Sequence, residues 1–317
     1  MSPSPDASAD NSAASNRSSS ADLAAARLGI LGGSGLYAME GLEAIEEIVV
    51  DTPYGPPSDS LRLGRIGDLD VVFLARHGRH HTHLPSDVPY RANLWALRSL
   101  GVRWILSVSA VGSLQEELQP LDFLVPDQFI DRTHQRPLTL FGDGLVAHVT
   151  AADPFCPVLS DLLADTGRQL MPEGRTLHQG GTYLCMEGPA FSTRAESELY
   201  RSWGAHVIGM TNHTEARLAR EAEIAYATLA MVTDYDCWHQ EHASVTVERV
   251  IDNLRSNASL AQRIVRATAE RISRERPASK AHSALRHALM TPREQVSPAS
   301  RRKFDLFTAP YWGAFEG

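Results

Sequence analysis

Short apolar runs that end in glycine or polar residues recur along this chain, and they constrain its fold more than any other feature. Apolar runs of four to eight residues bounded by such turn signals are typical of buried strands. They occupy residues 28–31, 71–75, 104–108, 123–126, 205–210 and 225–232. We therefore expect a sheet whose strands are distributed from the start of the sequence to beyond its middle.

Segments with apolar residues at helical spacing lie between or after these runs. They are residues 90–100, 192–203, 215–223 and a long amphipathic stretch at 247–274. Strands alternating with helices predict an α/β domain with a largely parallel sheet. We see no internal repeat and no central linker, so we expect one domain over residues 27–290.

Both ends of the chain differ from this pattern. Residues 1–26 are polar and of low complexity, and we expect this segment to be disordered. Residues 291–317 form a C-terminal extension that contains five aromatic residues after a polar stretch. So many aromatic side chains favour docking on this chain or on a neighbouring subunit over exposure to water. A disordered tail is the alternative.

Composition narrows the class of protein. The 317 residues carry 30 basic and 38 acidic side chains, a formal net charge of −8, which argues against a nucleic-acid or acidic-membrane partner. The three cysteines are isolated, as in proteins of a reducing compartment. No apolar run approaches the ~20 residues of a membrane span, and the N-terminus lacks the order of a secretory signal. We expect a cytoplasmic enzyme.

Polar residues follow the predicted strands repeatedly. They are Ser34, Arg76 and His77, Ser109 and Ala110, Met210 and Thr211, and Asp234 and Asp236. Ligand sites in α/β sheets lie at the carboxyl ends of strands, so we expect these residues to meet. The glycine-loop amides, the hydroxyls and the forked guanidinium of Arg76 are donors suited to an oxyanion such as phosphate. Taken singly, each residue also fits a turn, a cap or the surface.

Two other interpretations of these segments fit less well. The glycine-rich sequence at 32–35 lacks the third glycine of a dinucleotide loop, and no acidic residue follows at the usual offset. Four histidines lie within residues 77–83, but a glycine and two arginines accompany them and no HExxH pattern is present. We therefore expect neither a dehydrogenase nor a metal site.

Asp234 and Asp236 are two residues apart after the last apolar run. In extended geometry their side chains point the same way. Two such carboxylates can accept hydrogen bonds from an exocyclic amine, and a protonated one can donate to a ring nitrogen. A helix cap or an acidic surface loop is the alternative.

Several sequence blocks closely resemble the S-methyl-5′-thioadenosine phosphorylases, a family in the trimeric branch of the purine nucleoside phosphorylases. The resemblance runs in order from about residue 28 to 290. Its blocks include GILGGSGLY (29–37), ARHGRHH (75–81), SAVGSL (109–114), EGPAFSTRAE (187–196), GMTNHTEARLAREAEIAYA (209–227) and TDYDCW (233–238). The resemblance implies a one-domain α/β fold around a central mixed sheet flanked by helices, in a homotrimer. It also implies a pentosyltransferase that uses phosphate and needs no metal or organic cofactor.

The same resemblance implies roles for individual residues. Ser34, Arg76, His77, Ser109, Ala110 and Thr211 would hold phosphate, Met210 would lie under the ribose, Phe191 near the base and His148 near the methylthio group. Asp234 and Asp236 would bind adenine, and we expect Asp234 to protonate its N7 as a general acid.

Two positions bear on the choice of substrate. The related 6-oxopurine enzymes carry Glu where Ser192 stands and Asn near Asp234, so this chain favours a 6-aminopurine. Where the family usually has Pro before Glu215, this chain has Thr214, with His213 before it. We still expect Glu215 to face the site, while His213 leaves the 5′ substituent of the sugar open.

Three other functions remain to be weighed. A phosphorylase of adenosine, methylthioinosine or inosine is the nearest alternative. A nucleosidase that uses water leaves the Arg76 cluster without a purpose, and a non-catalytic nucleoside-binding protein has few supporting features.

Overall fold

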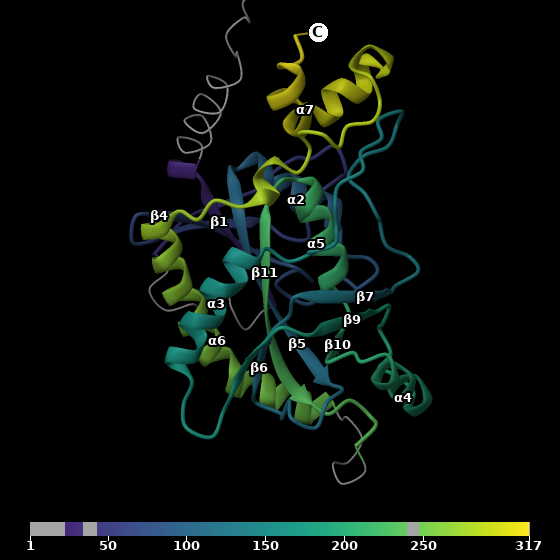
Figure 1. Ribbon diagram of the computed structural model, residues 1–317. Coiled ribbons are helices and arrows are strands. Elements are labelled where there is room, and N and C mark those ends of the chain that lie inside the picture. The colour runs from purple at the N-terminus through teal and green to yellow at the C-terminus, as the bar shows by residue number, and fades with distance from the viewer. Residues whose placement is uncertain (1–22, 34–42, 240–246, 317) are drawn as a thin grey trace, which may run out of the picture.

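The computed structural model describes residues 23–33, 43–239 and 247–316 (Figure 1). Within these residues, eleven strands form one mixed sheet with helices on both faces, which confirms the predicted α/β fold. The strands are β1 (Arg27–Gly32), β2 (Glu43–Ile48), β3 (Leu61–Ile66), β4 (Leu69–Ala75), β5 (Val102–Ser113), β6 (Phe123–Val125), β7 (Gln128–Arg132), β8 (Leu177–Gln179), β9 (Thr182–Met186), β10 (Val207–Gly209) and β11 (Ala225–Asp234). The α-helices are α2 (Tyr90–Ser99), α3 (Pro157–Leu170), α4 (Arg194–Ser202), α5 (Asn212–Glu221), α6 (Val247–Glu275) and α7 (Pro298–Trp312).

The long strand β5 is the centre of the sheet. The order along the main path is β2-β3-β4-β1-β5-β10-β9-β7, and β11 pairs with both β5 and β6. β1 is parallel to β4 and β5, and β11 is parallel to β5. β10 runs antiparallel to β5, and β2 and β3 add an antiparallel edge. The carboxyl ends of β4 and β11 therefore point the same way as that of β5.

Each predicted apolar run contributes to a strand, but β5 extends beyond the predicted end. Ser109 and Ala110 lie within β5, opposite Ala230 and Met231 of β11, and not after the strand. Their polar or small side chains are compatible with a strand because β11 pairs with the backbone there. β2, β3, β7, β8 and β9 and the helices α3 and α7 were not predicted.

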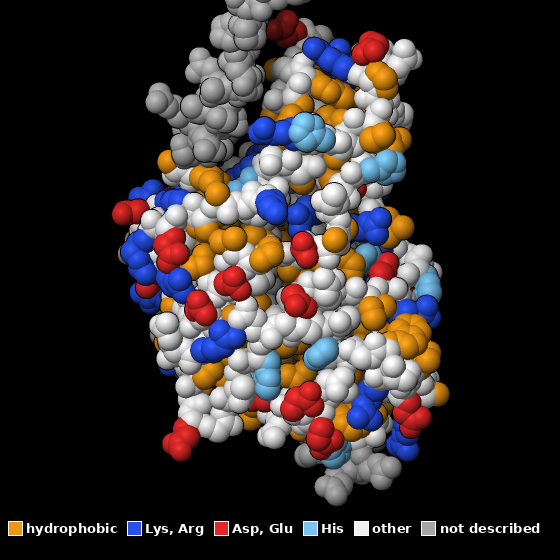
Figure 2. Space-filling view, viewed as in Figure 1, with side chains coloured by type: hydrophobic (Ala, Val, Ile, Leu, Met, Phe, Trp, Pro, Cys, Tyr) orange, Lys and Arg blue, Asp and Glu red, His pale blue; other side chains and the backbone are white. Residues whose placement is uncertain are grey.

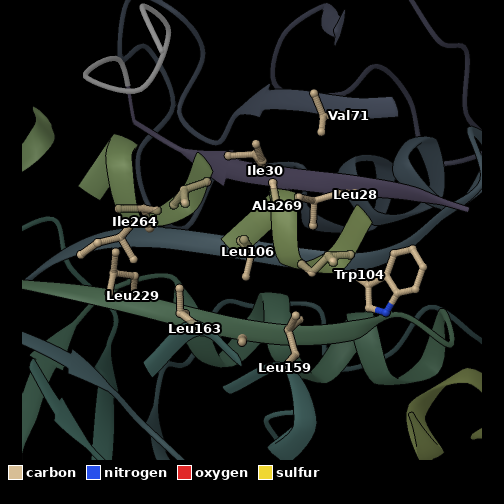
Figure 3. Close-up of a cluster of buried hydrophobic side chains, with 14 of the residues drawn as sticks. Leu28, Ile30, Val71, Trp104, Leu106, Leu159, Leu163, Leu229, Ile264 and Ala269 are labelled. Carbon is tan, nitrogen blue, oxygen red and sulfur yellow. The ribbon is translucent and has the colours of Figure 1, made fainter. Parts of the chain in front are cut away.

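Two apolar clusters hold the helices onto the sheet. On one face, Leu28 and Leu106 pack against Leu163 of α3 and Ile264 of α6 (Figure 3). On the other face, neighbouring strand residues such as Ile105 pack against α2, α5 and α7. Alternate residues of one strand thus enter different cores. This explains why β1, β5 and β11 are apolar without alternation.

The C-terminal extension folds back onto its own chain. Ser297 caps α7, and Phe304 and Phe307 are buried against Phe141. The hydroxyl of Tyr311 donates to Glu223. The polar stretch before these aromatic residues forms the first turns of α7, which the aromatic residues hold against the core.

At the other end, the side chains of Leu23 and Ala26, which the sequence placed before the domain, are buried in the first core cluster. None of the helices that the structure describes has the length and apolarity of a membrane span. The face shown in Figure 2 carries both acidic and basic side chains.

Candidate active site

A cavity of about 470 Å³ lies at the carboxyl ends of β4, β10 and β11 and beside the second half of β5. This volume is within the usual range for small-molecule sites, about 300–1,000 Å³. Most of the predicted site residues line it: Arg76, His77, Ser109, Ala110, Phe191, Met210, Thr211, Asp234 and Asp236. Residues separated widely in the sequence meet here because β4 and β11 end on the same side as β5, and the antiparallel β10 ends beside the second half of β5.

Three of the remaining predicted residues, Glu215, Ser192 and His148, do not line this cavity. Ser34 lies outside the described residues. Glu215 is 2% exposed and lies behind Arg76, and Ser192 lies beside Asp236, whose pKa it lowers against the larger effect of burial. His148 is exposed and borders a second cavity of about 170 Å³.

Arg76 follows β4 and is only 3% exposed. Its Nε and Nη2 donate to the two carboxylate oxygens of Glu215, with Nη2 2.9 Å from Oε2. Nη2 also donates to Ser107 Oγ at 2.6 Å, and Nη1 to the carbonyl of Val108 at 3.1 Å. Of the five N–H donors of a guanidinium, one on Nη1 is left for a ligand. The fork that we expected to grip an oxyanion is therefore used inside the protein.

His77, the next residue, is held by its own loop. Its Nδ1 lies 2.9 Å from the carbonyl oxygen of His83, and because a carbonyl only accepts, Nδ1 carries the hydrogen. Burial and the neighbouring Arg76 lower the pKa of His77 to about 4. The ring is thus neutral at pH 7, and its Nε2 is an acceptor, suited to an O–H group of a bound ligand.

Asp234 and Asp236 meet through a turn, not through an extended strand. Asp234 is the last residue of β11, and Asp236 has a left-handed φ of 49°. The backbone N–H of Asp236 donates to Asp234 Oδ1 at 2.8 Å. The predicted convergence of the two side chains is found, but a local hydrogen bond and not strand periodicity produces it.

Burial raises the pKa of both carboxyls. Thr233 Oγ1 lies 2.7 Å from Asp234 Oδ2 and 3.1 Å from the carbonyl of Val111. One hydroxyl hydrogen serves only one of these acceptors. If it goes to Val111, a protonated Asp234 donates to Thr233, so the contacts accommodate a neutral carboxyl. Asp236 Oδ2 is buried without a hydrogen-bond partner among the described residues.

The histidine-rich segment contributes His81 as well as His77 to the cavity wall, with their rings stacked at a centroid distance of 4.4 Å. In the part of the chain that the structure describes, no group of three or more His, Cys, Asp and Glu side chains is arranged to hold a metal.

His213 and its neighbours Asn212 and Thr214 are buried in the first turn of α5 and do not border the cavity. The His213 ring packs edge-on against Phe129, with Nδ1 3.4 Å from a carboxylate oxygen of Asp131. Residues 212–214, where the sequence departs from the usual family pattern, therefore pack behind the cavity and do not form its wall.

Tyr183 is a site residue that the sequence reasoning missed. It is the second residue of β9 and borders the same cavity as Ser109 and Gly209. Its sequence context is an apolar run, which predicts core packing and nothing else. Only the pairing of β9 with β10 brings it to the site.

Comparisons with known proteins show the family to which this chain belongs. A profile described as the phosphorylase superfamily matches residues 27–270. S-methyl-5′-thioadenosine phosphorylase from Prochlorococcus marinus is 68% identical over 290 residues, 92% of each chain.

Two solved structures are similar as well. A methylthioadenosine phosphorylase from an antarctic soil metagenomic library has a TM-score of 0.85 and 51% identity, covering 89% of this chain and 98% of its own. A variant of adenosine/methylthioadenosine phosphorylase from Schistosoma mansoni, in complex with methylthioadenosine, has a TM-score of 0.74 and 36% identity, covering 79% and 92%.

Proposed function

We propose that this chain, which belongs to the phosphorylase superfamily and within it to the S-methyl-5′-thioadenosine phosphorylase family, cleaves S-methyl-5′-thioadenosine with inorganic phosphate. The products are adenine and S-methyl-5-thioribose 1-phosphate. One observation carries the proposal: a single cavity joins a buried arginine and hydroxyl donors to a pair of carboxyls, of which Asp236 is buried and Asp234 is half-buried. The first set suits a phosphate and the second suits the leaving purine.

At the phosphate end, Arg76, Ser109 and Thr211 line the cavity together. Glycosidic cleavage develops positive charge on the sugar near C1′. A phosphate fixed below C1′ stabilises that charge and then forms the new bond to carbon. Because Glu215 neutralises Arg76, the hydroxyls and backbone amides carry much of the phosphate binding.

At the base end, Asp234 acts as the general acid. Adenine is a poor leaving group as an anion, and protonation at N7 lowers the barrier. Burial raises the pKa of Asp234, which favours the neutral form that this role requires. Asp236, with a free buried oxygen, accepts a hydrogen bond from the 6-amino group. Ser192 beside it lacks the carboxylate that would bind a 6-oxopurine.

We further propose that the enzyme works as a homotrimer in the cytoplasm, in purine and methionine salvage, without metal or organic cofactor. His148 supports an oligomer, because it lies outside the cavity of its own chain. Its predicted place near the methylthio group therefore requires a neighbouring subunit. Sedimentation of the purified protein tests the trimer.

The direct test is incubation with methylthioadenosine, with and without phosphate, followed by chromatography for free adenine. We expect adenine only when phosphate is present. Adenine released at the same rate without phosphate would indicate a nucleosidase, and tight binding without adenine would indicate a binding protein. Loss of activity on treatment with a chelator would contradict the cofactor-free reaction.

Adenosine is the second candidate substrate. The Schistosoma mansoni neighbour is named for both adenosine and methylthioadenosine, and the pair Asp234 and Asp236 selects the base but not the 5′ group. Rates on methylthioadenosine, adenosine, methylthioinosine and inosine separate these possibilities. We expect the two 6-aminopurines to react faster than the two 6-oxopurines.

A further inference from the structure

Two buried hydroxyl groups, those of Tyr183 and Ser109, lie at the wall of the cavity. Tyr183 is fully buried and Ser109 is 9% exposed. Neither oxygen makes a hydrogen bond of good geometry with any residue in the described part of the chain. A buried hydroxyl without a partner destabilises the folded state, so such a group in a native protein requires an explanation.

The two groups are neighbours although their strands differ. Ser109 belongs to β5 and Tyr183 to β9. Burial raises the pKa of Tyr183, and the nearby Ser109 hydroxyl lowers it in part. The phenol is consequently neutral at physiological pH and has an O–H to donate.

The Tyr183 phenol occupies the space that Gly209 leaves by having no side chain. A Cβ atom at residue 209 would be 1.8 Å from the Tyr183 hydroxyl oxygen, so the tyrosine occupies space that only a glycine leaves open. The next residues, Met210 and Thr211, are those proposed for ribose and phosphate. The phenol oxygen therefore lies beside the proposed phosphate end of the cavity.

A phosphate bound in this cavity would need hydroxyl groups as hydrogen-bond donors, because Arg76 can supply few. Arg76 has one N–H left for a ligand, because Glu215, Ser107 and the carbonyl of Val108 take the others. Phosphate oxygens accept hydrogen bonds, and a serine hydroxyl donates only one. A partner that fills a lone pair of the serine oxygen with its own hydrogen leaves the serine hydrogen free for the phosphate.

We propose that Tyr183 is a positioning residue for phosphate: its O–H donates to Ser109 Oγ and thereby directs the Ser109 O–H to the attacking phosphate. This inference rests on the proposed function and deepens it. It assigns the two unpartnered hydroxyls one chain of hydrogen bonds that is completed when phosphate binds.

Steady-state kinetics of four proteins test it: wild type, Tyr183→Phe, Ser109→Ala and the double variant. We expect Tyr183→Phe to raise the KM for phosphate about fivefold to tenfold, the effect of one hydrogen bond of about 1 kcal/mol or slightly more. The KM for methylthioadenosine should stay within about twofold, and in the Ser109→Ala background the second substitution should add nothing.

Tyr200→Phe is the matched control. Tyr200 is a buried tyrosine of α4 that does not line the cavity. Its loss of a hydroxyl should leave both KM values at the wild-type level. A purely structural role for Tyr183 would lower thermal stability or change both KM values alike. An unchanged KM for phosphate, or an equal effect in the presence and absence of the Ser109 hydroxyl, would overturn the proposal.

Calorimetric titration with inorganic phosphate separates this inference from the proposed function. If the wild type binds phosphate but releases no adenine, the proposed reaction is wrong. A fivefold weaker binding to Tyr183→Phe would then still support the positioning role, and equal binding would refute it. If the wild type neither turns over nor binds phosphate, both proposals are wrong.

Discussion

Arg76 donates hydrogen bonds to both carboxylate oxygens of Glu215, and each side chain is at least 97% buried. The hydroxyls of Ser107 and Tyr226 donate to the same carboxylate, at 3.0 and 2.7 Å. A buried ion pair of this kind is strongly coupled, because removal of one partner leaves the other charge in a medium of low polarity. The pair holds the guanidinium at the cavity with little freedom to move.

Glu215→Gln is therefore expected to lower the free energy of unfolding by about 3–5 kcal/mol, since Arg76 would remain as an unpaired buried cation. Urea denaturation measures the change. Glu221→Gln is the control, because Glu221 is similarly buried but its carboxylate accepts hydrogen bonds from Thr139 and the backbone of Leu140, not from an arginine. Equal losses in the two variants would contradict a special coupling to Arg76.

Asp234→Asn should lower the turnover number about 100-fold or more, because an amide cannot protonate the leaving base. At high pH, however, we expect the same substitution to stabilise the folded protein. Burial raises the folded-state pKa of Asp234, so the proton's contribution to stability is complete below the unfolded pKa and is lost as pH rises through the folded one. Asparagine resembles the protonated acid and avoids that loss.

The Asn variant should thus unfold at a temperature no lower than the wild type at pH 8. Scanning calorimetry at pH 5 and pH 8 measures this, and the difference between the two proteins should favour the variant more at pH 8. Near-normal turnover in the variant would rule out Asp234 as the acid.

The burial of His213 leads us to expect that the protein loses stability in acid. Both ring nitrogens lack a hydrogen-bond partner among the described residues, and burial lowers the pKa to about 4 although Asp131 raises it in part. The unfolded chain therefore takes up the proton first, so stability falls as pH drops from about 6.5 to 4. His213→Leu should lose about 2–3 kcal/mol less than the wild type over this interval in urea titrations.

His80→Leu serves as the comparison, because His80 is an exposed histidine of the loop after β4. It should follow the wild-type pH dependence. Parallel curves for His213→Leu and the wild type would show that the His213 charge does not oppose folding.

Phe304→Ala tests whether the C-terminal helix is part of the fold. Phe304 is 1% exposed and packs against Phe141, with ring centroids 5.6 Å apart. Truncation of a buried phenylalanine costs about 3–5 kcal/mol. Phe315→Ala, at a partly exposed position, should cost far less. A loss below 1 kcal/mol for Phe304→Ala would mean that α7 is dispensable for the stability of the domain.

The elements that could be predicted from the sequence are those whose buried residues form a local apolar pattern. β1, β5 and β11 are apolar on both faces, and α6 repeats its apolar residues at helical spacing. β7 could not be predicted in this way, because all five of its residues are partly or fully exposed. Its backbone is satisfied by β9, which no local pattern of β7 indicates.

The local sequence predicts which residues follow the central strands, and it correctly indicated that Arg76 and Asp234 lie at strand ends on the same side of the sheet. This is possible because a buried strand is apolar, so the polar residues that follow it mark its end. Which of these groups meet depends on how the strands are ordered and packed in the folded chain. Glu215 pairs with Arg76 across 139 residues, and Tyr183 of β9 and Ser109 of β5 border one cavity although their strands are not neighbours. Such contacts depend on strand order and register, which are set by packing between distant segments and not by the local sequence.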